Sequence, residues 1–221
     1  MSLTHNKLQF THSQKNRFDE ERARLVLSHF FEDKYKDAEM SESPDIVNRV
    51  LSIGVEVTSS MNGEIQEAVS RAGAISGKTE NELQKREREN IRTGRVIARQ
   101  LPDGRYLAGT TAFWGSNYDF QGCWNKKLKK LNSPHFTCFQ ENYLFVFAWM
   151  ADSEDVEEGI KIFQENISEH DYEKVFDRIY IFSGTELVEV YMLNGEIGRY
   201  SINSDVMKKI SKTAREKVLE I

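Results

Sequence analysis

The sequence predicts an α/β protein in which helices cover both sides of a mixed β-sheet. Three observations support this fold class. Residues 16–32 repeat apolar side chains at helical spacing, residues 51–58 alternate apolar and polar side chains, and residues 142–150 are almost continuously apolar, as in a strand buried on both faces. With 221 residues, 39% of them hydrophobic, the chain is long enough to bury one core, so we expect a single domain over residues 1–221.

Composition excludes several classes of protein. The sequence has no run of eighteen apolar residues and its first sixteen residues are polar, so we expect a cytoplasmic protein that does not contact membranes. Its two cysteines, Cys123 and Cys138, cannot form a disulfide framework. A formal net charge of -5 argues against a protein that coats nucleic acid nonspecifically, but it leaves room for a local basic groove.

The first half of the chain predicts a helix, a strand pair and an insertion. The helix over 16–32 has an apolar side formed by Ala23, Val26, Leu27, Phe30 and Phe31. Residues 46–50 lead into a strand whose apolar face carries Leu51, Ile53, Val55 and Val57. Residues 62–118 form the predicted insertion, with exposed helical pieces in the charge-rich part up to residue 100 and a hairpin that turns at Pro102-Asp103-Gly104.

The second half predicts a return to alternating helices and strands. Residues 119–131 have helical spacing, and residues 142–150 form the buried strand. Asp152-Ser153 can cap a helix with an apolar side of Val156, Ile160, Phe163 and Ile167. Strands are expected over 178–183, 187–193 and 198–202, before a last helix whose apolar side carries Val206, Ile210, Ala214 and Val218.

Two carboxylates flank the predicted strand pair. Glu56 points away from the apolar face of its strand, and Asp45 lies eleven positions earlier, an interval that suits two strand segments folded back on each other. Converging acids of this kind can bind a hard cation such as Mg²⁺, which takes few protein carboxylates and keeps water or phosphate oxygens as its other ligands. The alternative is that Asp45 is a turn residue after Pro44 and that Glu56 faces water.

These residues resemble the motif of the PD-(D/E)xK nuclease superfamily. Pro44-Asp45 and Glu56-Val57-Thr58 match the pattern, except that Thr58 stands where the motif has lysine. Several branches of that superfamily carry the lysine on the next core helix, which here corresponds to residues 120–131. On that helix Lys127 lies on the apolar side, while Lys126, Lys129 and Lys130 fall on more exposed faces. Alternatively, Lys127 sits at the edge of the apolar side and extends into solvent.

The resemblance implies a restriction-endonuclease-like fold and a metal-dependent nuclease that acts on DNA. Asp45, Glu56, Glu20 of the first helix and the carbonyl of Val57 would hold Mg²⁺ or Mn²⁺. Asp19 of the same helix is nearly as well placed as Glu20. Lys127 would position the attacking water. Basic residues between 85 and 99, with Lys126, Lys129 and Lys130, would follow the DNA backbone. The alternative is that these residues simply form a solvated surface. The chain could also form a homodimer, as many similar nucleases do.

Two further functions stay open. The missing motif lysine is compatible with an inactive nuclease fold that binds nucleic acid or a protein partner. Residues 72–79 (AGAISGKT) also fit a relaxed phosphate-binding loop, which would make the protein a nucleotide binder. A working loop of that kind must follow a buried strand and open a helix, whereas here a polar helix is expected before it.

Overall fold

The computed structural model describes residues 12–110, 118–165 and 172–220. The chain divides into two compact units. The first unit contains the residues before 61 and after 119, and the second contains residues 61–119. The second unit coincides, within a residue at each end, with the segment that the sequence predicts as an insertion.

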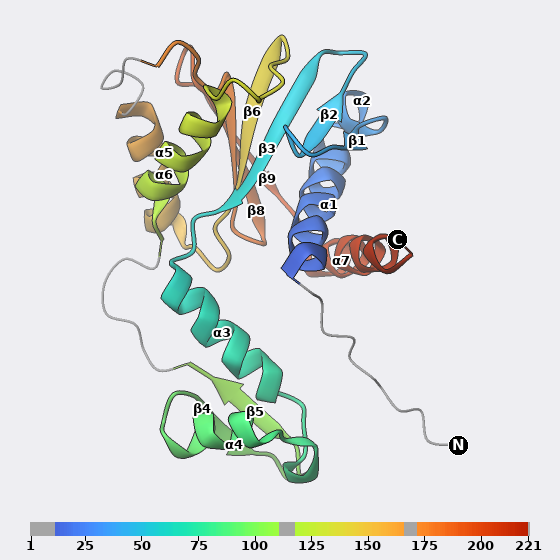
Figure 1. The fold of residues 1–221 in the computed structure, drawn as a ribbon, viewed down its shortest axis with the longest axis vertical. Coiled ribbons are helices and arrows are strands. Elements are labelled where there is room, and N and C mark those ends of the chain that lie inside the picture. Colours follow the sequence, from blue (N-terminus) through green and yellow to red (C-terminus); the bar gives the residue numbers. More distant parts are fainter. Residues whose placement is uncertain (1–11, 111–117, 166–171, 221) are drawn as a thin grey trace. The chain divides into compact units, whose positions relative to one another are not determined.

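The first unit contains a seven-stranded mixed sheet in the described part of the chain, with strand order β1-β2-β3-β6-β7-β8-β9 (Figure 1). Its strands are β1 (Glu39–Met40), β2 (Ile46–Asn48), β3 (Ile53–Ser59), β6 (Glu141–Phe147), β7 (Arg178–Phe182), β8 (Glu186–Tyr191) and β9 (Ile197–Ser201). The three central strands β3, β6 and β7 are parallel, and the other neighbours are antiparallel. The prediction of a mixed α/β fold is therefore confirmed.

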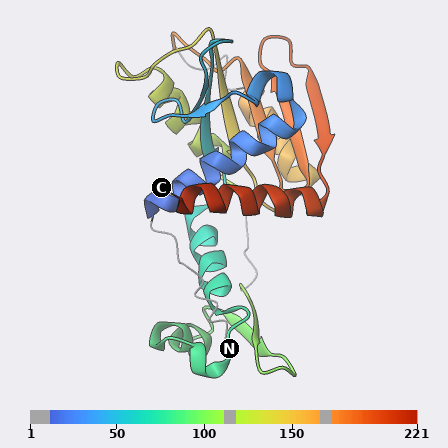
Figure 2. The same cartoon turned by 90° about the vertical axis from the view of Figure 1, so that its right-hand side faces the viewer.

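Helices cover both faces of this sheet (Figure 1). On one face, α1 (His12–Phe30), α2 (Glu32–Tyr35) and α7 (Ser204–Leu219) share a core with the central strands, which includes Ala23, Val55, Phe145, Tyr180 and Ile210. Figure 2 shows α7 lying against α1. On the other face are α5 (Phe120–Leu131) and α6 (Ser153–Glu165).

The second unit has a small core of its own. It contains α3 (Gly63–Ile75), a 3₁₀ turn at Glu80–Glu82, α4 (Lys85–Arg92) and the antiparallel hairpin of β4 (Ile97–Gln100) and β5 (Tyr106–Gly109). Ala72, Ile75, Leu83 and Val96 form the buried cluster. The expected helical pieces and the hairpin turn at Pro102-Asp103-Gly104 are both present, and Gly104 has the positive φ of 81° that such a turn requires.

One strand boundary differs from the prediction. The alternating pattern places Leu51 in the strand, but β3 begins at Ile53, and Leu51 is 45% exposed in the turn after β2. The side chain of Asn48 accepts hydrogen bonds from the amides of Val50 and Leu51 and so closes this turn. Ile167, predicted on the apolar side of α6, lies outside the described residues.

Candidate functional site

The position of Asp45 is set by the pairing of β2 with β3. Ile46 pairs with Val55 in the antiparallel register, so the chain just before β2 runs beside Glu56 and Val57. Pro44 packs so closely on Gly54 that a Cβ there would lie 2.6 Å from the proline Cγ, which means that this contact requires glycine. The Val57 amide donates a hydrogen bond of 2.6 Å to Asp45 Oδ2, and Asp45 is 7% exposed.

Glu56 lies in the middle of β3 and is completely buried. Because side chains alternate along a strand, Glu56 points to the face opposite Val55 and Val57, which is the face covered by α5. A buried carboxylate needs charged or hydrogen-bonding partners. Those partners come from α5.

Two lysines of α5 neutralise the acid pair. Lys127 Nζ donates to Glu56 Oε2 at 2.6 Å and lies 3.6 Å from Asp45 Oδ2. Lys130 Nζ donates to Glu56 Oε1 at 2.6 Å and lies 3.8 Å from Asp45 Oδ1. Each ammonium group thus contacts one oxygen of each acid, and both oxygens of Glu56 are paired.

The apolar side of α5 holds these lysines in place. Phe120, Cys123, Trp124, Leu128 and Leu131 are buried along this side, and Trp124 contacts the rings of Phe163 and Phe176. Lys127 and Lys130 are three residues apart, so they lie on neighbouring turns of one helix face. Packing of the helix therefore fixes the backbone from which both side chains reach the acids.

The surroundings keep Lys127 charged. Burial lowers the pKa of its ammonium, but the charges of Asp45 and Glu56 and the hydrogen bonds to both acids outweigh burial, so the pKa lies above the ordinary lysine value. Lys127 is therefore a permanent cation near neutral pH. It cannot act as a general base there.

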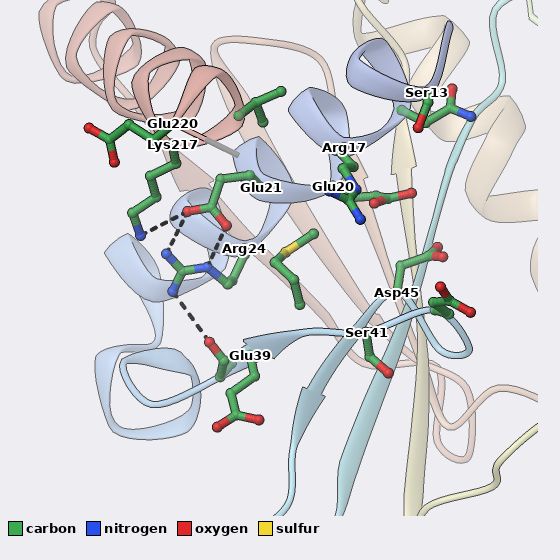
Figure 3. Close-up of a pocket in the computed structure, with 15 residues that line it drawn as sticks. Ser13, Arg17, Glu20, Glu21, Arg24, Glu39, Ser41, Asp45, Lys217 and Glu220 are labelled. Atoms are coloured by element: carbon green, nitrogen blue, oxygen red, sulfur yellow. Dashed lines mark hydrogen bonds and ion pairs between the residues drawn. The ribbon is translucent and has the colours of Figure 1, made fainter.

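Glu20 lies at the edge of this group, in a pocket of about 1010 Å³ that Asp45 also lines. Figure 3 shows Glu20 on α1 and Asp45 at the same end of the pocket. Burial, together with the negative charges of Asp45 and Glu56, raises the pKa of Glu20 to about 7, although Lys127 and Arg17 act in the opposite direction. Near neutral pH this carboxyl group is divided between its protonated and charged forms.

Glu21 is buried although it lies outside the apolar side that the sequence predicts for the first helix. Glu21 is 4% exposed and receives two hydrogen bonds from Arg24, at 2.8 and 2.7 Å. Lys217 of α7 lies 3.0 Å from the same carboxylate (Figure 3). The cause is the docking of α7 on α1, which buries a second side of the first helix.

The carboxylate oxygens of the site suit a hard cation, but the charges of Asp45 and Glu56 are already balanced by the two lysines. Asp45, Glu56 and Glu20 offer carboxylate oxygens, the donors that Mg²⁺ and Mn²⁺ prefer, and the pKa of Glu20 is raised first by burial and then by the negative charges of Asp45 and Glu56. Across the described ranges, however, no group of three or more His, Cys, Asp and Glu side chains could hold a metal ion as it stands. The ammonium groups of Lys127 and Lys130 occupy the oxygens of Glu56 instead.

The remaining predicted residues divide between the site and the surface. Lys126 and Lys129 are exposed, as the sequence predicts. Lys130 is more exposed than Lys127, at 36% against 12% of the side chain, as the sequence predicts, but it also pairs with Glu56, which is not among the sequence predictions. The sequence does carry a signal for this pairing: Lys127 and Lys130 are three residues apart, which places both on the same side of the helix. Thr58, at the position of the motif lysine, is partly buried on β3.

Residues 72–79 do not have the geometry of a phosphate-binding loop. Ala72–Ile75 form the last turn of α3, and the amides of Gly77 and Lys78 donate to the carbonyls of Tyr106 and Ile75. Lys78 Nζ pairs with the buried Glu87 at 2.6 Å. The amides and the ammonium that would bind phosphate are thus engaged within the unit itself.

Comparisons with known proteins found no family model, no curated protein and no solved structure that matches this chain. Among the helices of the described residues, none is long and apolar enough to cross a membrane.

Proposed function

We propose that this protein is a divalent-metal-dependent phosphodiester hydrolase that acts on DNA, with a restriction-endonuclease-like core. The observation that carries the proposal is that Lys127 meets Asp45 and Glu56, at 3.6 and 2.6 Å, although it is 71 residues from Glu56 in the sequence and farther still from Asp45. The order of elements adds support. The helix α1, the antiparallel strands β1 to β3, the helix α5 and a strand β6 parallel to β3 follow the order of core elements in the superfamily whose motif the sequence resembles.

In this proposal each residue has a separate task. Asp45, oriented by the Val57 amide, and Glu56 would hold the cation, and Glu20 and the Val57 carbonyl would be further ligands. A bound divalent cation supplies polarisation of the scissile phosphate and lowers the pKa of a water molecule. Lys127, which stays charged, would orient the attacking water and stabilise the negative charge that develops on the phosphate oxygens.

Basic side chains of the second unit supply candidate contacts to the DNA backbone. Lys85, Arg86, Arg88, Arg92, Arg95 and Arg99 are exposed on α4, β4 and the residues between them. Arg88 and Arg92 form ion pairs with Glu80 and Glu89. Exposed pairs of this kind contribute little to stability, so phosphate groups can replace their acids. Lys130, in contrast, is removed from this role by its pairing with Glu56.

A cleavage assay tests the proposal. Supercoiled plasmid and single-stranded DNA are incubated with Mg²⁺ or Mn²⁺ and with wild-type protein, Asp45→Asn, Glu56→Gln or Lys127→Met. Each of these three substitutions is expected to lower the cleavage rate by roughly a hundredfold or more. The matched control is Lys208→Met, an exposed lysine of α7 that has no part in the proposed site, which should leave the rate unchanged. Cleavage that survives both acid substitutions would refute the proposal.

The second candidate function is nucleic-acid binding without cleavage. The specific observation in its favour is that both oxygens of Glu56 are paired with ammonium groups, so the acids have no unsatisfied charge that requires a metal. This function predicts DNA binding that is independent of Mg²⁺ and Mn²⁺, without products under any of the conditions above. Gel-shift and cleavage measurements on the same protein preparation separate the two functions.

A further inference from the structure

We propose that Lys130 is a built-in counter-ion at the cation position of the Asp45–Glu56 pair, so that a divalent cation binds there only by displacing Lys130. The inference rests on the proposed function, which provides the reason for a cation to bind. It goes further by giving a role to a residue that the superfamily motif does not contain.

The Lys130 ammonium lies where a cation shared by Asp45 and Glu56 would contact both carboxylates. Its Nζ lies 2.6 Å from Glu56 Oε1 and 3.8 Å from Asp45 Oδ1, so one positive charge contacts one oxygen of each acid. Carboxylate oxygens of two acids around one cation are the arrangement that a divalent ion uses. The lysine and the ion therefore compete for the same oxygens.

Lys130 is the lysine that can leave. Its side chain is 36% exposed, whereas that of Lys127 is 12% exposed. Lys130 also belongs to the last turn of α5, which ends at Leu131. Its long side chain can return to solvent without leaving the helix, but Lys127 would lose partners while it stays buried.

The charges in the site favour release of Lys130 when a cation enters. The two acids are balanced by the two lysines as the structure stands. With both lysines retained, a divalent ion would bring the positive charges facing the two acids to four. Repulsion between the ion and the nearest ammonium group is strong in a buried site, where water screens charges poorly. Departure of Lys130 lowers the positive charges facing the two acids from four to three and frees one oxygen of each acid.

Titration of Mn²⁺ alone, without nucleic acid, tests this inference. Isothermal calorimetry is carried out on the full chain as wild-type, Lys130→Met and Lys129→Met, with circular dichroism to verify that each variant is folded. Lys130→Met is expected to bind Mn²⁺ about tenfold more tightly or better, the size expected when one charge-assisted hydrogen bond no longer competes for a carboxylate. Lys129→Met removes the same charge from the neighbouring exposed position and should change the affinity less than about twofold, because its charge is screened by water.

Four outcomes overturn the inference. The first is equal Mn²⁺ affinity in Lys130→Met and wild-type protein, and the second is an equal gain in Lys129→Met, which would indicate a general charge effect. The third is that Mn²⁺ does not bind to any folded variant. If the gain in Lys130→Met persists after Asp45→Asn is added, the ion binds elsewhere and the inference also fails.

The titration separates this inference from the proposed function. Tighter Mn²⁺ binding by Lys130→Met in a protein that cleaves no DNA supports the counter-ion role and rejects the nuclease. Metal-dependent cleavage that needs Asp45 and Glu56, combined with unchanged Mn²⁺ affinity in Lys130→Met, keeps the nuclease and rejects the counter-ion role.

Discussion

Removing the two lysines of α5 should destabilise the first unit by more than the sum of the single effects. Lys127→Met leaves Glu56 with one ammonium partner, Lys130, and Lys130→Met leaves it with Lys127. The double substitution leaves a carboxylate with no exposed surface and no cation beside it. Methionine keeps the length of the side chain, so the lost interaction is chiefly electrostatic.

The expected magnitudes follow from burial. A hydrogen bond to a charged group contributes about 1.5–3 kcal/mol, so Lys127→Met, at a position only 12% exposed, should cost about 2 kcal/mol. Lys130→Met, at 36% exposed, should cost about 1 kcal/mol because water screens the pair. The double variant leaves an unpaired buried charge, for which a loss of about 5 kcal/mol is expected, so the coupling energy is about 2 kcal/mol.

Urea unfolding in the presence of a chelator measures these differences, because the chelator prevents stray metal ions from replacing the lysines. Glu56→Gln added to the double variant should recover part of the loss, since an amide costs less to bury than an unpaired carboxylate. The reasoning is refuted if each single substitution costs less than about 0.5 kcal/mol and the two effects add. It is also refuted if Glu56→Gln restores nothing.

Three further predictions concern other residues. Gly54→Ala should destabilise the first unit by about 1–3 kcal/mol in the same unfolding assay, because the new Cβ would overlap Pro44. Gly63→Ala should be neutral or stabilising, because no atom lies within 4 Å of its new Cβ. Since the pKa of Glu20 is raised to about 7 in the folded state, that state binds more protons than the unfolded chain, and the contribution of Glu20 to stability should fall as the pH rises from 4.5 to 7. Urea unfolding of Glu20→Gln should show a weaker dependence of the unfolding free energy on pH over this range, and an unchanged dependence contradicts the assignment. Arg99→Ala should weaken DNA binding equally for all sequences. In fluorescence anisotropy titrations, the slope of log binding constant against log salt concentration should become smaller in magnitude by about one, and a loss of affinity that depends on sequence would contradict a backbone contact.

The order and type of the elements could be predicted from the sequence because each has a clear period. The apolar side of α7 is an example, since Ile210, Ala214 and Val218 recur every four residues and all three are buried. The boundaries were harder to predict. Leu51 continues the alternating pattern of β3, but the turn closed by Asn48 overrides that pattern. Local hydrogen bonds of this kind leave little trace in the spacing of apolar residues.

The candidate site could be predicted in part. The sequence places Asp45 beside Glu56 through the strand pair and Lys127 on the inner side of α5, and the structure brings all three together. It does not indicate Lys130, because a position beside the apolar side of a helix reads as surface although a long side chain can reach inward from it. It also does not predict the burial of Glu21, since the helix that covers this residue is almost two hundred positions away in the sequence.

Thr58 is the departure from the nuclease motif, and the charge balance of the site gives a physical reason for it. Thr58 follows Glu56 by two residues on β3 and therefore points to the same face. A lysine at this position would add a third ammonium to two acids that are already paired with two. In a largely buried site the extra positive charge would be costly. Because α5 supplies Lys127 and Lys130, charge balance favours a neutral residue at position 58, so Thr58 does not by itself argue against the proposed function.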